Sequence, residues 1–235
     1  MTQEITVYTA LIGKCGDHLR PPMVSPDHRG RRVHYVCFAD ADNALKVPEP
    51  WELRPPVWQM ADQPRLTARW HKLASTILFD ISAYSLWHDA THQLCVNPWQ
   101  MVDGYLHGVR DFGLFRHAQR RCVYDELQAC EALRKAEGEK LRAQADRYRK
   151  AGYPGQAGLF ETGAVLRANN TTVSAVNAAW WDELVLTTPR DQPALPYVLW
   201  SRAVMSRVAI LPGCSTNSEF FYFHSHNRDM ADAAV

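Results

Sequence analysis

Residues 84–94 read YSLWHDATHQL, and this stretch decides the predicted fold. Apolar and aromatic side chains lead up to Asp89, where the apolar pattern stops and a polar segment begins. A short apolar run of this kind is typical of a buried strand. In open α/β sheets, the residues that follow the carboxyl end of a strand line the crevice in which ligands bind. Asp89 is therefore the first candidate for a functional carboxylate.

Two earlier runs have the same character, ITVYTALIG at 5–13 and VHYVCFAD at 33–40, and the second again ends in an acid. Spacing typical of helices appears in four further segments: 65–79, 120–151 with a break at Gly138, 172–186 and 191–205. Shorter extended segments are expected at 112–115, 158–170 and 217–227, and the proline-rich segment 48–64 is expected to be a loop that could hold one short edge strand. Strands that alternate with helices predict an α/β protein with a Rossmann-type, mostly parallel sheet flanked by helices.

Composition places limits on the kind of protein. A chain of 235 residues fits one large domain, and an apolar fraction of 46% is sufficient for a sizeable core. The formal net charge of +1 argues against a generally basic nucleic-acid binder. A local basic surface stays open as an alternative, at RGRR (29–32) or along 134–150.

The cysteine pattern and the apolar runs bear on the compartment. The six cysteines form no C-x-x-C pair, which predicts reduced thiols. The N-terminal sequence has no signal-peptide pattern, and no apolar run approaches the ~20 residues of a membrane span. We therefore expect a cytoplasmic protein with no membrane partner, and its oligomeric state stays open.

A series of segments resembles, in order, a family of glycosyltransferase-like domains long catalogued as a domain of unknown function. Plant members of that family were once described as alkaline ceramidases. The matching segments are YTALIG, YVCFAD, RLTARWHKL, YSLWHDATHQL, FRHAQRRCVYDEL, YPGQAGLFETGAVLR and WWDELVLTTPRDQPALPYVLW. The resemblance implies a GT-A-like fold in a single domain over 1–235. Residues 1–115 would form the nucleotide-sugar-binding half and 116–235 the acceptor and sugar-side half.

The resemblance also implies an activity and a metal. The activity is transfer of a hexose from a nucleoside diphosphate sugar, first of all a UDP-hexose, to a hydroxyl of an acceptor such as a glycan. Similar folds carry a D-x-D metal motif, but here the corresponding residues are Asp89-Ala90-Thr91, so the second acid is missing. The expected ion is Mn²⁺ or Mg²⁺. Its candidate ligands are Asp89 with His224 and His226, which share one face of an extended segment.

Candidate donor-binding residues lie at the ends of the first two strands and on the helix at 65–79. The resemblance places Tyr8, Thr9 and Asp40 against the nucleotide base and ribose, with the nearby acid at position 42 an equal alternative to Asp40. Arg69 and Lys72 are three residues apart on the helix, so they project to the same side. There they would neutralise the departing diphosphate.

The group Arg190-Asp191-Gln192 is placed by the resemblance beside the sugar and the acceptor. Asp191 would contact sugar hydroxyls or act as the base on the acceptor hydroxyl, although an aspartate that only begins a helix is the structural alternative. Arg190 would join the cations, Gln192 would bind the donor, and Glu161 is a second candidate for the acceptor base.

Three other functions compete with this interpretation. One is a phage-type DNA glycosyltransferase acting on a hydroxylated modified base. The phosphates of the DNA backbone would then contact residues 29–32 and 134–150. Another is a catalytically silent module that binds a nucleotide or a glycan, suggested by the incomplete metal motif. The third, a lipid amide hydrolase, lacks both a nucleophile elbow and a zinc-binding spacing.

Overall fold

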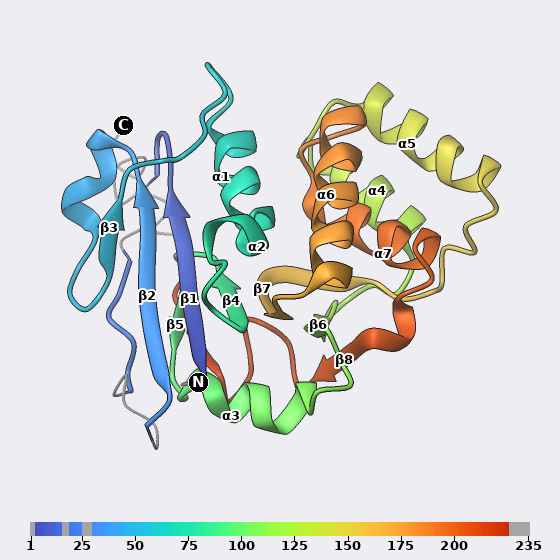
Figure 1. Cartoon of the computed structure of the whole chain (residues 1–235). Helices are drawn as coiled ribbons and strands as arrows, with labels where there is room; N and C mark the ends of the chain where they lie inside the picture. Colours follow the sequence, from blue (N-terminus) through green and yellow to red (C-terminus); the bar gives the residue numbers. More distant parts are fainter. Residues whose placement is uncertain (1–2, 16–18, 25–29, 226–235) are drawn as a thin grey trace.

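A seven-stranded sheet dominates the computed structural model, which describes residues 3–15, 19–24 and 30–225 (Figure 1). The strands stand in the order β3-β2-β1-β4-β7-β6-β8. Their bounds are β1 Glu4–Leu11, β2 Arg32–Ala39, β3 Glu52–Arg54, β4 Tyr84–His88, β6 Phe112–Arg116, β7 Phe160–Ala168 and β8 Val208–Leu211. A separate antiparallel pair joins β5 (His92–Leu94) to β9 (Phe221–Phe223).

All strands of the large sheet except β7 run in one direction. β1 is parallel to β2 and β4, β2 to β3, and β6 to β8, whereas β7 is antiparallel to both β4 and β6. The carboxyl ends of β1, β4, β6 and β8 therefore meet at one edge of the sheet, together with the start of β7. The strand order reverses between β1 and β4, the place at which open α/β sheets bind their ligands.

Helices cover both faces of the sheet. Their bounds are α1 Pro64–Leu73, α2 Ser75–Leu78, α3 Pro98–Met101, α4 Val123–Ala132, α5 Gly138–Lys150, α6 Thr171–Leu186 and α7 Asp191–Ser201. Helices α1, α6 and α7 pack on one face around Trp180 and Trp87, and α3 with the β5–β9 pair closes the other around Trp99. Helices α4 and α5 share a third apolar cluster beside α7. Among the described residues, none of the helices is long and apolar enough to cross a bilayer.

The predicted α/β class and most of the predicted elements are confirmed, with a few differences. Residues 84–94 form two strands, β4 and β5, rather than one. The chain turns at Asp89, whose carbonyl accepts a hydrogen bond from the His92 amide at 2.9 Å. The predicted helix at 65–79 ends at Leu73 and restarts at Ser75, which leaves Ile77 72% exposed. Strand β8 was not predicted, because its four residues are too short to show a pattern. The division of the domain at 115/116 stays a prediction.

Gly13, in the loop after β1, offers a test of how tightly this edge of the sheet is packed. Its φ is +75°, and an added Cβ would lie 2.6 Å from the Cβ of Pro64 at the start of α1. We expect Gly13→Ala to cost about 1–2 kcal/mol for the left-handed backbone and a further ~1–3 kcal/mol for the clash. Urea unfolding measures the sum.

The matched control is Gly152→Ala. Gly152 has a similar φ of +79°, but an added Cβ meets no atom within 4 Å. This variant should lose only the backbone contribution. Equal losses in the two variants would show that the loop after β1 is not pressed against α1.

Candidate active site

A buried ion pair joins α1 to α7 beneath the carboxyl edge of the sheet. Nζ of Lys72 lies 2.5 Å from Oδ2 of Asp191 and also donates a hydrogen bond to the carbonyl of Thr162. The Thr162 hydroxyl donates to the same carboxylate oxygen at 3.0 Å. The indole N–H of Trp180 donates to the backbone carbonyl of Asp191 at 3.0 Å. One carboxylate thus fixes α1, β7 and α7, with α6 bonded to its backbone.

Arg69 extends this pair towards the second carboxylate of the site. Its Nε lies 3.3 Å from Oδ1 of Asp191, and one terminal nitrogen lies 3.9 Å from Oδ1 of Asp89. The indole N–H of Trp87 donates to Asp89 at 2.9 Å, which orients that side chain at the end of β4. The Asp89 side chain is 38% exposed, whereas that of Asp191 is 3% exposed. Asp89 is therefore the carboxylate that a ligand can reach.

The protonation of Asp191 decides what it can do. Burial alone would raise the pKa of its carboxyl, but the charges of Arg69 and Lys72 outweigh burial and hold that pKa well below the ordinary value. A carboxylate held by two cations accepts a proton poorly at neutral pH. Asp191 therefore fits a positioning role better than the predicted role of acceptor base.

A cavity of about 960 Å³ opens beside this cluster, between the segment that follows β1 and the start of α1. Lys14, Arg65 and Arg69 line it, and it also touches Pro189, the residue before Arg190. Partial burial and the neighbouring charges of Arg190 and Arg69 lower the pKa of Arg65, so Arg65 is close enough to both to be repelled by them. Nε of Arg190 is buried and has no hydrogen-bond partner in the described part of the chain.

Residues predicted to contact the nucleotide lie deeper than expected. The Tyr8 hydroxyl donates to the carbonyl of Lys72 at 2.7 Å and accepts from Arg167 at 2.8 Å, and the Tyr8 and Thr9 side chains are fully buried. Direct contact with base or ribose does not fit these positions, because β1 continues to Leu11 before the edge is reached. Lys72 is likewise enclosed, so the prediction that it touches the diphosphate must be corrected to support through Asp191.

Asp40 has a definite role in the loop that borders the cavity. One carboxylate oxygen accepts from the Gly13 amide at 2.6 Å, and the other accepts from the Asn43 side chain at 2.7 Å. Asn43 also donates to the carbonyl of Gly13 at 2.8 Å. Asp40 therefore shapes the wall of the cavity, and the structure gives both of its oxygens protein partners.

The remaining predicted residues have partners on the side of α4. Gln192 donates to Glu126 at 3.3 Å. Glu161 accepts from the backbone amides of Ala118, at 3.2 Å, and Ser215, at 2.6 Å. Glu161 thus connects the loops after β6 and β8 at the start of β7.

The described residues do not complete a metal-binding set. His224 pairs through Nε2 with Gln93 at 3.0 Å, and His226 lies outside the described residues. No group of three His, Cys, Asp or Glu side chains in the described part is placed to hold an ion. Asp89 supplies one carboxylate, so the expectation of Mn²⁺ or Mg²⁺ stays a prediction.

Two residues of the site were missed from the sequence. Arg65 is the first of three basic residues at helical spacing, with Arg69 and Lys72, and that spacing was the available signal. His92 is buried three residues after Asp89, and its Nε2 has no partner among the described residues. His92 lies within the segment 84–94, but nothing in the sequence pattern distinguishes it from an ordinary core histidine.

The basic segments considered for DNA contact are largely neutralised within the protein. Arg31 forms a two-pronged hydrogen bond with Asp103. On α5, Arg142, Arg147 and Arg149 pair with Glu131, Glu183 and Asp146. Residue 29 lies outside the described residues. The geometry gives no support to a phosphate-binding surface along α5.

The charge balance around Asp191 predicts an asymmetric response to mutation. Asp191→Asn leaves both Lys72 and Arg69 without their buried acid, and we expect a loss of about 3–5 kcal/mol in the free energy of unfolding. Lys72→Met should cost less, because Arg69 still partners the carboxylate. Urea unfolding at pH 7 measures both. Equal or negligible losses would contradict a structural role for the pair.

The pH dependence provides the matching control. Because the folded pKa of Asp191 is lowered, its stabilisation is complete above its unfolded pKa of about 3.9 and is lost as the pH falls through the folded value. Wild-type stability should therefore fall more steeply below about pH 4 than that of Asp191→Asn.

Comparisons with known proteins agree with this architecture. The solved apo structure of the WbbM bifunctional glycosyltransferase matches with a TM-score of 0.54 at 12% identity, covering 90% of this chain and 39% of that one. At that identity the likeness concerns the fold alone.

Sequence comparison identifies the relatives. The chain is 28% identical over 130 residues to a protein of Arabidopsis thaliana named probable hexosyltransferase MUCI70. That match covers 52% of this chain but only 22% of the longer plant protein. A family model described as TOD1/MUCI70, glycosyltransferase-like domain, matches residues 58–226, which include α1, Asp89 and Asp191. The chain therefore belongs to the TOD1/MUCI70 glycosyltransferase-like family.

Proposed function

We propose that this protein transfers a hexose from a nucleoside diphosphate sugar to a hydroxyl group of an acceptor. The donor diphosphate would lie in the cavity between the loop after β1 and the start of α1. The family and its hexosyltransferase relative support glycosyl transfer. The choice of a nucleotide donor, with UDP as the first candidate, is part of the proposal.

The observation that carries the proposal is the excess of positive charge beside this cavity. Positive charges outnumber negative ones at and beside this cavity: the cations are Lys14, Arg65, Arg69, Lys72 and Arg190, and the acids are Asp62, Asp89 and Asp191. Proteins seldom bring several guanidinium groups together without an anion to offset their repulsion. A diphosphate supplies that negative charge.

The fold adds two further reasons to place a diphosphate here. The cavity is lined by the segment after β1, one of the two strands at the reversal of strand order, where open α/β sheets bind nucleotides. Arg69 on its wall lies 3.9 Å from Asp89, which follows the other of these strands, β4. The first turn of α1 forms part of its wall, and free N–H groups at a helix N-terminus favour an anion.

In the proposed reaction, the bond between the anomeric carbon and the diphosphate breaks as the acceptor hydroxyl attacks. The hydroxyl proton would pass to a carboxylate, for which Glu161 stays the candidate. Negative charge grows on the leaving diphosphate, and Arg65 and Arg69 would stabilise it there. Lys72 and Asp191 act indirectly, because their buried pair holds Arg69 in place. Asp89 is the accessible carboxylate at the adjoining strand end and would face the donor sugar. The expected Mn²⁺ or Mg²⁺ would be held by Asp89 together with the diphosphate oxygens, since the described residues supply no complete ligand set of their own.

Arg65→Gln tests the position of the diphosphate. Arg65 is an exposed residue whose guanidinium donates a long hydrogen bond, 3.3 Å, to the carbonyl of Lys135, so the variant should fold. We expect UDP to bind the wild type at least tenfold more tightly than the variant, about 1.4 kcal/mol, with uridine affinity unchanged. Titration calorimetry measures both ligands.

Arg202→Gln is the control, because Arg202 is an exposed arginine outside the cavity lining. Its UDP affinity should equal that of the wild type. Undiminished UDP binding in Arg65→Gln would place the diphosphate elsewhere. Tight UDP binding by the wild type without transfer or hydrolysis of any UDP-sugar would instead favour a silent nucleotide-binding module.

Asp89→Asn tests the exposed carboxylate and the expected metal together. The amide oxygen can still accept the Trp87 hydrogen bond, whereas the negative charge is lost. We expect Mn²⁺ to strengthen UDP binding by the wild type, and the substitution to reduce affinity in Mn²⁺ at least tenfold. Asp80→Asn, at an exposed acid, is the control. Identical UDP affinities with and without Mn²⁺ would remove the metal from the proposal.

A further inference from the structure

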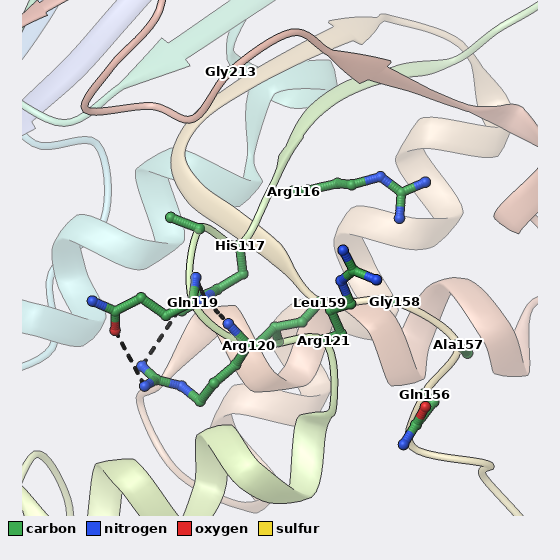
Figure 2. A pocket seen from close by; sticks show the side chains of 11 residues that line it. Arg116, His117, Gln119, Arg120, Arg121, Gln156, Ala157, Gly158, Leu159 and Gly213 are labelled. Carbon is green, nitrogen blue, oxygen red and sulfur yellow. Dashed lines mark hydrogen bonds between the residues drawn. The ribbon is translucent and has the colours of Figure 1, made fainter.

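A second cavity, of about 660 Å³, opens at the same edge of the sheet (Figure 2). Its walls are the end of β6 with the loop that leads to α4, the segment before β7, and Gly213 after β8. Three arginines and a histidine line it: Arg116, Arg120, Arg121 and His117. No lining residue carries a carboxylate.

The four basic side chains are not equivalent. Arg120 donates to Glu126 at 2.6 Å, and His117 lies 3.6 Å from the same carboxylate, so Glu126 offsets this half of the cluster. The exposed side chains of Arg116 and Arg121 have no hydrogen bond or ion pair within the part of the chain that the structure describes. Figure 2 shows the guanidinium groups of Arg116 and Arg121 on the side of the cavity nearer Gly158, while Arg120 extends to the other side, towards Gln119. Two uncompensated positive charges therefore share one cavity.

The topology fixes how far this cavity lies from the proposed donor site. Along the edge, β4, β7 and β6 are consecutive, so Asp89 after β4 and Arg116 at the end of β6 are two strand spacings apart across the sheet, about 10 Å. They are also offset along β7, because Asp89 bonds to Gly163 whereas Arg116 is in register with Phe160, so their separation exceeds that spacing. Glu161 lies between them and bonds to Ala118 of the cavity wall, and the next residue, Thr162, bonds to Asp191. The cavity is thus separate from the diphosphate position but beside the proposed point of transfer.

From this geometry we propose that Arg116 and Arg121 bind a phosphate monoester carried by the sugar acceptor. The proposal rests on the transfer function above and names the acceptor's chemical class. A phosphate monoester is close to a dianion at neutral pH, which matches two free guanidinium groups, and each fork can donate two hydrogen bonds to its oxygens. A carboxylate or a phosphodiester carries one charge and would leave one arginine uncompensated.

The test uses the whole protein with the donor site filled. Glucose 6-phosphate, glucose and glucuronate are titrated by calorimetry in saturating UDP, against the wild type and the double variant Arg116→Gln with Arg121→Gln. We expect glucose 6-phosphate to bind the wild type at least tenfold more tightly than either other sugar. The double variant should lose that preference while its UDP affinity stays unchanged.

The control is Arg202→Gln with Lys150→Gln, which removes the same charge from exposed positions that line neither cavity. It should bind glucose 6-phosphate as the wild type does. A free sugar phosphate and a phosphorylated glycan share this chemistry. Transfer to a 6-phosphorylated disaccharide rather than to glucose 6-phosphate would identify the glycan, and the reverse would identify the free sugar.

Several outcomes would overturn the proposal. One is glucuronate, or an oligonucleotide without a terminal phosphate, binding as tightly as glucose 6-phosphate. Another is glucose 6-phosphate binding undiminished in the double variant. A loss of UDP affinity in the double variant would assign this cavity to the donor instead. Absence of UDP binding in the wild type would defeat the transferase proposal separately, because glucose 6-phosphate can also be titrated without UDP.

Discussion

The buried pair between Lys72 and Asp191 is the interaction on which the rest of the site depends. A lysine with no exposed surface and an aspartate that begins a helix are costly to bury separately, so each requires the other. Their contact holds α1 against α7 and leaves Arg69 between two carboxylates. The position of the arginine cluster at the cavity follows from this arrangement.

The second constraint is the direction of the strands. Because β7 alone runs against the others, the ends of β1, β4, β6 and β8 and the start of β7 open to one side. The two cavities, the exposed Asp89 and the connecting Glu161 all belong to that edge. A donor and an acceptor bound to the two cavities would meet near the end of β4, which is the geometry that a transfer reaction requires.

Much of this architecture could be predicted from local patterns. Strands β1, β2 and β4 were recognisable as apolar runs, and the acids that follow β2 and β4 made Asp40 and Asp89 candidates. The direction in which a helical side chain points was harder. Arg69 and Lys72 were expected to act alike because they are three residues apart, yet one borders the cavity and the other is enclosed. That difference depends on where α7 places Asp191, a contact across 119 residues. Local spacing carries no information about such a partner.

The second cavity shows the same limit. Arg116, Arg120 and Arg121 are neighbours in sequence and look alike there. Arg120 differs from the other two because it pairs with Glu126, one turn into α4. Tyr8 likewise has the expected position on its strand, but it does not face a nucleotide. Its hydroxyl is hydrogen-bonded to Arg167 and to the carbonyl of Lys72 at the end of α1. The roles of these side chains therefore depend on their partners across the fold rather than on residue type.

A crystal structure of the protein with UDP tests most directly whether the diphosphate binds in the cavity beside Arg65 and Arg69. The account predicts phosphate oxygens within hydrogen-bond distance of Arg65 and Arg69, between the loop after β1 and the first turn of α1. Diphosphate density in the cavity of Arg116 and Arg121, or away from the carboxyl edge of the sheet, would contradict it.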